Sequence, residues 1–182
     1  MREIEIKLRV KDLDALEKDL AVKGCVFSDP IRQEDVIYSN GREDFFESAK
    51  AGDIIVRIRR QGNIIQLNLK QQRTYEMDNT EYETEIKDAE ETHKILEVLG
   101  WKPVIEVKKI RREGKLTGYK FCLDKVDDLG DFIEVEKMTN NDANPNEVRK
   151  ELFKAIEPFG LTEADEETKG YDTQMYQIKS RK

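Results

Sequence analysis

The sequence predicts an α+β fold in which helices cover a mainly antiparallel sheet. Apolar and charged residues alternate with a period of two in one run after another, which is typical of strands. Segments with helical spacing separate groups of these runs, in the order strand, helix, several strands, helix, three strands, helix. This order is typical of α+β domains.

The first half of the chain begins with a strand over Arg2–Val10, where from Glu3 onward apolar residues occupy the even positions and charged residues the odd ones. A helix is expected over Asp12–Lys23, because leucines recur at helical spacing and Gly24 stands where a C-terminal cap belongs. Gly62-Asn63 suits a tight hairpin turn. Further extended segments are expected over 26–38, 54–60, 64–71 and 80–87.

The second half repeats this layout. Asp88 is the expected N-cap of a helix that ends at Gly100 and buries Ile95, Leu96 and Leu99. Three strands over 104–112, 119–126 and 132–137 follow, then a helix from Asn144-Pro145 through 159 and a short helix over 168–178. Such a repeat could close the sheet into a barrel, although periodicity alone equally allows an open sheet.

Composition narrows the function classes. The chain has 182 residues, which suits one domain over residues 1–182, and a net charge of -7 with no long basic run, so nucleic acid and anionic membranes are not expected partners. No stretch approaches the roughly 18 apolar residues needed to span a bilayer, and we expect a cytoplasmic protein. His93 is the only histidine, which disfavours multi-histidine metal sites and most imidazole catalysis, and we expect it at the surface. Cys25 and Cys122 are isolated, and we interpret them as reduced core residues rather than zinc ligands.

Charged side chains occupy one face of strand after strand, as acidic pairs and as basic pairs. The acidic residues on these faces are Glu3, Glu5, Glu81, Glu83, Glu85, Asp124, Glu134 and Glu136. The basic residues are Lys7, Arg57, Arg59, Lys70, Lys109 and Arg111. An antiparallel sheet with one solvated face would produce such alternation. In the other interpretation the charged faces line a tunnel, where they are costly unless they meet opposite charges or a ligand.

A polyphosphate with a divalent cation would satisfy both signs of charge. Arg and Lys match phosphate oxygens, and paired carboxylates are hard ligands for Mg²⁺ or Mn²⁺. The sequence has neither a Walker A loop nor G-x-G-x-x-G, so side chains would have to hold the phosphates.

The order of these motifs resembles the CYTH superfamily, which includes class IV adenylyl cyclases and thiamine triphosphatase-like proteins. The resemblance begins with Glu3-Ile4-Glu5-Ile6-Lys7, similar to the family's E-x-E-x-K signature, and covers about residues 1–171. The motifs that follow in order are Gln33-Glu34-Asp35 with Tyr38, Val56-Arg57-Ile58-Arg59, Leu69-Lys70, Glu81-Tyr82-Glu83-Thr84-Glu85, Lys109-Ile110-Arg111, Leu123-Asp124 and Gly130-Asp131-Phe132-Ile133-Glu134-Val135-Glu136.

The resemblance implies an eight-stranded, mainly antiparallel β-barrel, the triphosphate tunnel, with helices packed outside. It implies phosphate binding by Lys7, Arg57, Arg59, Lys70, Lys109 and Arg111. It implies Mg²⁺ or Mn²⁺ held by Glu3, Glu5, Glu134 and Glu136, with Glu83 or Glu85 as further acidic lining. Glu5, Lys7, Arg111 and Asp124 are the expected catalytic residues.

The activity implied is that of a metal-dependent enzyme on a triphosphate, for which class IV adenylyl cyclase, converting ATP to cyclic AMP and pyrophosphate, is the first expectation. A triphosphatase acting on inorganic triphosphate, thiamine triphosphate or a nucleoside triphosphate is the alternative, and a non-catalytic phosphate-binding module is a third. The family's class IV members also suggest a homodimer. Gln33 and Asp35 are equally compatible with the strand surface and the site, and Tyr171 with a mobile lid and the start of a docked helix.

Overall fold

A computed structural model describes residues 2–40, 46 and 50–180 of the chain. In this part of the chain one sheet contains nine strands. Their bounds are β1 (Arg2–Arg9), β2 (Val26–Phe27), β3 (Ile31–Ser39), β4 (Ile54–Gln61), β5 (Ile64–Gln72), β6 (Asp78–Glu85), β7 (Lys102–Leu116), β8 (Tyr119–Val126) and β9 (Gly130–Thr139).

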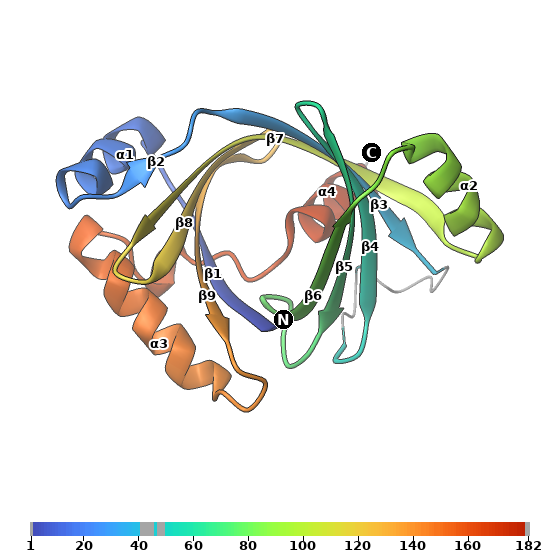
Figure 1. Ribbon diagram of the computed structural model, residues 1–182. Coiled ribbons are helices and arrows are strands. Elements are labelled where there is room, and N and C mark those ends of the chain that lie inside the picture. The colour runs from blue at the N-terminus through green and yellow to red at the C-terminus, as the bar shows by residue number, and fades with distance from the viewer. Residues whose placement is uncertain (1, 41–45, 47–49, 181–182) are drawn as a thin grey trace.

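The sheet closes on itself. Neighbouring strands follow the order β7-β3-β4-β5-β6-β1-β9-β8, and β8 pairs again with β7, so eight strands form a closed antiparallel barrel (Figure 1). The short strand β2 adds to the part of β7 that extends beyond β3, where Val26 and Phe27 face Lys115 and Gly114. The predicted α+β class and the eight-stranded antiparallel barrel are confirmed.

Period-two alternation explains how the barrel wall is built. On β1 the even positions Ile4, Ile6 and Leu8 are fully buried on the outer face, under the helices α1 (Leu13–Val22) and α3 (Pro145–Ile156). Outer-face residues of β8 and β9 and the leucines of both helices complete this cluster. The odd positions of β1 consequently point into the barrel.

The helix caps follow the sequence closely. Asp12 accepts a hydrogen bond from the Ala15 amide at 2.9 Å, and Asn144 accepts one from Asn146 at 3.0 Å. Asp88 caps α2 (Ala89–Val98) by accepting from the amides of Glu90 and Glu91. These caps satisfy amides that have no partner inside the helix.

The predicted buried stripe of α2 is confirmed for Leu96 and wrong for Ile95 and Leu99. Ile95 is 52% exposed and Leu99 is 67% exposed, whereas Ala89 and Leu96 are buried against β3, β4 and β5. The face of α2 that points toward the barrel contains Ala89, His93 and Leu96, which are also spaced as on one side of a helix. His93 Nδ1 lies 3.0 Å from the Tyr38 hydroxyl. His93 is therefore half-buried against the barrel, because the helix is rotated relative to the expected face.

The helix α4 (Tyr171–Lys179) occupies a different position from the other helices (Figure 1). Its Tyr171 and Met175, one turn apart, pack in one cluster with Ile37 and Val107, which are on the inner face of the barrel. The chain reaches α4 from α3 through the short 3₁₀ turns η1 (Glu157–Phe159) and η2 (Glu163–Asp165). α4 thus covers part of the space that the strands enclose. None of the described helices is both long and apolar enough to cross a lipid bilayer.

Candidate functional site

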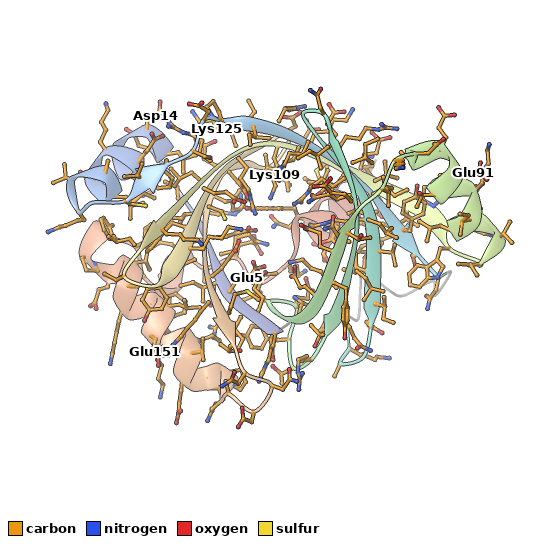
Figure 2. All side chains as sticks on the ribbon, in the orientation of Figure 1. Glu5, Asp14, Glu91, Lys109, Lys125 and Glu151 are labelled. Atoms are coloured by element: carbon orange, nitrogen blue, oxygen red, sulfur yellow. The ribbon has the colours of Figure 1, made fainter. Side chains whose placement is uncertain are left out.

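The barrel encloses a cavity of about 330 Å³, a volume typical of small-ligand sites. Charged side chains from the inner faces of the eight barrel strands line it, together with the first residues of α4. Figure 2 shows the two kinds of position: Glu5 and Lys109 point into the enclosed space, whereas Glu91 and Glu151 lie on the outer helices. The cavity is therefore lined by the charged faces that the sequence places on alternate positions.

Three carboxylates form a compact cluster on β1 and β9. Glu3, Glu5 and Glu136 each offer an oxygen, and these atoms all lie within 4.8 Å of one another. The antiparallel register explains the cluster, because Glu5 and Glu136 are direct Cα partners. Burial and the neighbouring carboxylates, against the field of Lys70, raise the pKa of Glu3 to about 9 and that of Glu5 to about 7. Such a cluster of hard oxygen ligands fits a divalent cation, which would remove this repulsion.

Lys70 is one of the cations that contact this cluster. Its Nζ lies 3.6 Å from Glu3 and forms a close ion pair with Glu81. Burial opposes the charge of Lys70, but Glu81, Glu5 and Glu3 outweigh it and raise the pKa of the amine. Glu81 in turn has a pKa of about 2, because Lys70 and Arg57 outweigh its burial. Lys70 and Glu81 are Cα partners across β5 and β6, so the register brings them together.

Asp124 is the centre of a second, fully buried network. Lys109 donates to its Oδ2 at 2.9 Å, and Arg111 donates from Nε to Oδ1 at 2.7 Å. The Tyr171 hydroxyl donates to Oδ2 at 3.0 Å, and Arg111 also contacts Glu134. Burial would raise the pKa of Asp124, but Arg111 and Lys109 hold it below its usual value. This carboxylate therefore stays ionised and orients two cations toward the cavity.

Lys7 lies close to the same network. It is 1% exposed, its Nζ donates to the backbone carbonyl of Lys169, and the ammonium lies 4.4 Å from the centre of the Tyr171 ring. Lys109 lies 4.9 Å from the same ring centre. Tyr171 is therefore the start of a docked helix, and its ring and hydroxyl contact both lysines and Asp124.

Arg57 and Arg59 share one carboxylate. Arg59 makes a bidentate pair with Asp35, with both N–O distances at 2.7 Å, and Arg57 Nη1 lies 3.6 Å from Asp35 Oδ2. Burial alone would raise the pKa of Asp35, but the two guanidinium groups lower it to about 2. Asp35 thus lies in the site, and Arg59 is largely neutralised by it.

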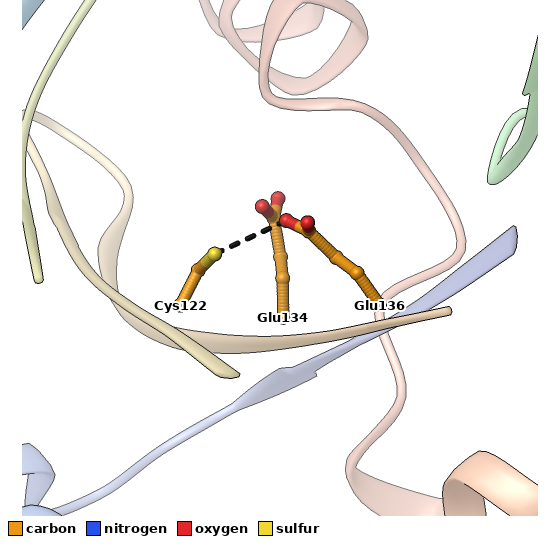
Figure 3. Close-up of side chains that lie close together, drawn as sticks. All are labelled: Cys122, Glu134 and Glu136. Atoms are coloured by element: carbon orange, nitrogen blue, oxygen red, sulfur yellow. Dashed lines mark hydrogen bonds between the residues drawn. The ribbon is translucent and has the colours of Figure 1, made fainter. Parts of the chain in front are cut away.

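Cys122 contacts one of the carboxylates that line the cavity. Its Sγ lies 3.1 Å from Glu136 Oε1, with Glu134 beside it (Figure 3). Burial raises the pKa of the thiol well above its usual value, against the field of Arg111, so the neutral thiol donates to the carboxylate. Cys122 is buried and free of a disulfide, yet it faces the charged interior rather than the apolar core that contains Cys25. Its position two residues before Asp124 on β8 is the signal that could have indicated this.

The acidic residues of β6 differ in whether they line the cavity. Glu83 lines the cavity and accepts hydrogen bonds from Gln66 Nε2 at 2.8 Å and Asn68 Nδ2 at 2.6 Å. Glu85 is exposed at the last position of β6 and is not among the residues that line the cavity, so the expectation that it adds to the lining is not met. Strand parity assigns a face but not the point at which the strand leaves the barrel.

The sequence comparisons agree with this architecture. Residues 1–171 match the CYTH domain. Adenylate cyclase CyaB of Aeromonas hydrophila is 27% identical over 171 residues, which cover 94% of this chain and 87% of that protein.

Comparison with solved structures identifies the same barrel. PH1012 from Pyrococcus horikoshii is 28% identical, with a TM-score of 0.79 over 95% of this chain and 98% of that one. HpAC1 from Hippeastrum, described as having a dominant triphosphatase activity, is 16% identical with a TM-score of 0.63, over 98% of this chain and 95% of that one. At that identity the likeness concerns the fold alone.

Proposed function

This chain belongs to the CYTH family, and from that premise we propose that it is a divalent-metal-dependent adenylyl cyclase that converts ATP to 3′,5′-cyclic AMP and pyrophosphate. One observation carries the proposal: a cluster of three carboxylates and a row of buried cations line the same cavity. A triphosphate with a divalent cation is complementary to both. The similarity to CyaB along 94% of the chain supports the choice of ATP and cyclisation.

The carboxylates Glu3, Glu5 and Glu136 are the proposed metal ligands, because their oxygens lie within 4.8 Å of one another. Glu134 contacts Arg111 and lies beside Glu136. Because of this position next to Glu136, we propose Glu134 as the fourth metal ligand. When bound, Mg²⁺ or Mn²⁺ would neutralise phosphate charge and lower the pKa of a coordinated hydroxyl.

The phosphates are the proposed ligands of the buried cations. Lys109 and Arg111 are oriented by Asp124, and Lys7 approaches the same region from β1. Arg57, Arg59 and Lys70 would contact the phosphate chain from β4 and β5. In the reaction the ribose 3′-oxygen forms a bond to the α-phosphorus, the bond from that phosphorus to the bridging oxygen breaks, and pyrophosphate leaves with the electron pair. Lys7 and Arg111 would stabilise the charge that develops on the phosphoryl oxygens and the leaving group.

The proton of the 3′-hydroxyl requires an acceptor. Glu5 is the proposed acceptor, because it lies within the carboxylate cluster, where a bound metal would also lower the pKa of a coordinated hydroxyl. Asp124 is unsuited to that role, because its oxygens already accept from Lys109, Arg111 and Tyr171. We therefore assign Asp124 to orienting the two cations.

A triphosphatase is the second candidate, supported by the barrel that this chain shares with HpAC1. In that reaction water attacks the terminal phosphorus, and the same cations would hold the chain of phosphates. The two candidates differ only in the nucleophile and in the phosphorus that is attacked.

Chromatographic analysis of the products distinguishes the candidates. Purified protein would be incubated with ATP, inorganic triphosphate or thiamine triphosphate, each with Mg²⁺, Mn²⁺ or a chelator. We expect cyclic AMP and pyrophosphate from ATP, abolished by chelator and by Glu5→Ala, and unaffected by Glu91→Gln on the outer face of α2. Orthophosphate without cyclic product would favour the triphosphatase. No turnover of any substrate would contradict both.

A further inference from the structure

Three glutamines lie together at one end of the cavity. Gln33 on β3 is the Cα partner of Gln61, the last residue of β4. Gln66 on β5 is the Cα partner of Arg59, which lies two residues before Gln61. All three line the cavity, next to the turn that joins β4 and β5. Amide groups therefore form part of the cavity wall at this end.

Gln33 is buried with an incomplete set of hydrogen bonds. It is 3% exposed, and its Nε2 donates to Gln61 Oε1 at 2.5 Å. Its own Oε1 is buried without a hydrogen-bond partner among the described residues. A buried carbonyl oxygen without a partner is unfavourable, so an acceptor of this kind in a cavity wall is suited to a ligand that donates a hydrogen bond.

The charges near this end are already paired. Arg59 is held by Asp35 in a bidentate pair, and Glu83 accepts from Gln66 and Asn68. The fully buried cations around Asp124 lie nearer to α4, since Tyr171 contacts the same carboxylate. The oxygens of an ionised, metal-bound triphosphate accept hydrogen bonds, so they do not match the Gln33 carbonyl, which is itself an acceptor. The occupant of this end must carry an N–H or O–H donor.

We propose that Gln33 and Gln61 form the subsite for the organic part of the substrate, and that this part is a nucleobase-type ring with an N–H donor and a ring acceptor. The inference rests on the proposed function, which supplies the triphosphate in the same cavity. Gln33 is the Cα partner of Lys109, so the amide end directly adjoins the phosphate-binding cations along β3 and β7. The ring donor meets Gln33 Oε1, and the amide of Gln61 offers a donor to the ring acceptor. Inorganic triphosphate leaves this subsite empty.

The test compares two ligands that differ only in the organic part. Binding of bismethylene-ATP and of bismethylene triphosphate, whose bridging carbons prevent turnover, is measured by calorimetry with Mn²⁺. For Gln33→Leu we expect about tenfold weaker binding of the ATP analogue, with the inorganic analogue changed by no more than about twofold. Gln61→Leu should act in the same direction. Gln72→Leu is the matched control, because Gln72 lines the cavity from the opposite end of β5 and should leave the ratio of the two affinities unchanged.

The outcomes separate the subsite from the proposed function. Equal weakening of both analogues by Gln33→Leu, or no weakening of either, would overturn the subsite. So would a wild-type protein that binds both analogues equally well, and the triphosphate site would then still stand. A wild-type protein that binds neither analogue would remove the proposed function and this inference with it.

Discussion

The Tyr171 hydroxyl donates a hydrogen bond to Asp124 at 3.0 Å, and this contact joins the first residue of α4 to the buried charges of β7 and β8. The two residues are 47 positions apart in the sequence. The Tyr171 ring also packs against Phe132 with a centroid distance of 5.1 Å. The helix at the end of the chain thereby contacts the same carboxylate that orients Lys109 and Arg111.

Tyr171→Phe removes this hydrogen bond and keeps the ring. We expect the free energy of unfolding to fall by about 1–2 kcal/mol, because Asp124 remains buried and loses one donor. Tyr171→Ala should cost about 3–5 kcal/mol, because the packing with Phe132 and Met175 is lost as well. Urea denaturation measures both values, and equal losses for the two variants would show that the hydroxyl, not the ring, provides the stabilisation.

Asp35→Asn should destabilise the protein by about 3 kcal/mol, because Arg59 would remain buried without its carboxylate. Added inorganic phosphate should restore part of this loss, since an anion can take the place of the carboxylate beside Arg57 and Arg59. Glu34→Gln is the matched control: Glu34 is exposed on the outer face of the same strand. Denaturation midpoints with and without phosphate provide the measurement, and an Asp35→Asn variant as stable as Glu34→Gln would refute the prediction.

The buried ion pair between Asp78 and Arg2 should make the stability of the folded state depend on pH. Arg2 donates to both oxygens of this buried carboxylate at 2.8 and 3.0 Å, and Thr74 donates at 2.7 Å. Burial would raise the pKa of Asp78, but Arg2 and Thr74 hold it below the ordinary value of 3.8. The folded state therefore binds this proton less readily than the unfolded state. The resulting stability is present above the ordinary pKa and is lost as the pH falls through the lowered pKa of the folded state.

Thermal melts between pH 2 and pH 6 test this sign. The melting temperature of the wild type should fall as the solution is acidified through and below about pH 4, and Asp78→Asn should reduce the slope in that range. Because other buried carboxylates with lowered pKa values also contribute, the slope should fall without vanishing. An unchanged slope in Asp78→Asn would contradict the role of the Arg2 pair.

The two cysteines should be protected in the native state. Cys25 is 2% exposed and Cys122 is fully buried, and burial raises the pKa of both thiols. We expect a disulfide reagent to modify neither at neutral pH in buffer, and both in guanidinium. Fast modification of Cys122 in the native protein would mean that the cavity wall beside Glu136 opens.

Strand parity accounts for most of what the sequence predicts correctly about the barrel and its interior. In β1, apolar residues alternate with Glu3, Glu5 and Lys7, and this pattern places the three charged residues on one face; that the face points inward follows from the resemblance to the CYTH family. Parity cannot assign partners, which depend on the register between strands. The pair of Lys70 with Glu81 and the pair of Arg59 with Asp35 arise from such registers. For that reason the sequence leaves Asp35 undecided and gives Glu81 no separate role.

The remaining differences come from contacts between distant segments. Tyr171 reaches Asp124 only because α4 docks on the inner face, and no local pattern around residue 171 encodes that docking. On α2, the apolar residues Ile95 and Leu99 suggest a buried face, yet Ala89 and Leu96 are buried because of how the helix rests on β3 to β5. The rotation of a short helix is set by its packing partners, which the helix sequence does not contain.

The most direct test of the central claim is the anomalous diffraction of Mn²⁺ in crystals grown with bismethylene-ATP. The account predicts a manganese peak between Glu3, Glu5 and Glu136, with phosphate oxygens in contact with Lys109 and Arg111 in the same cavity. Nucleotide bound only outside the barrel, or an occupied cavity without manganese at these carboxylates, would contradict it.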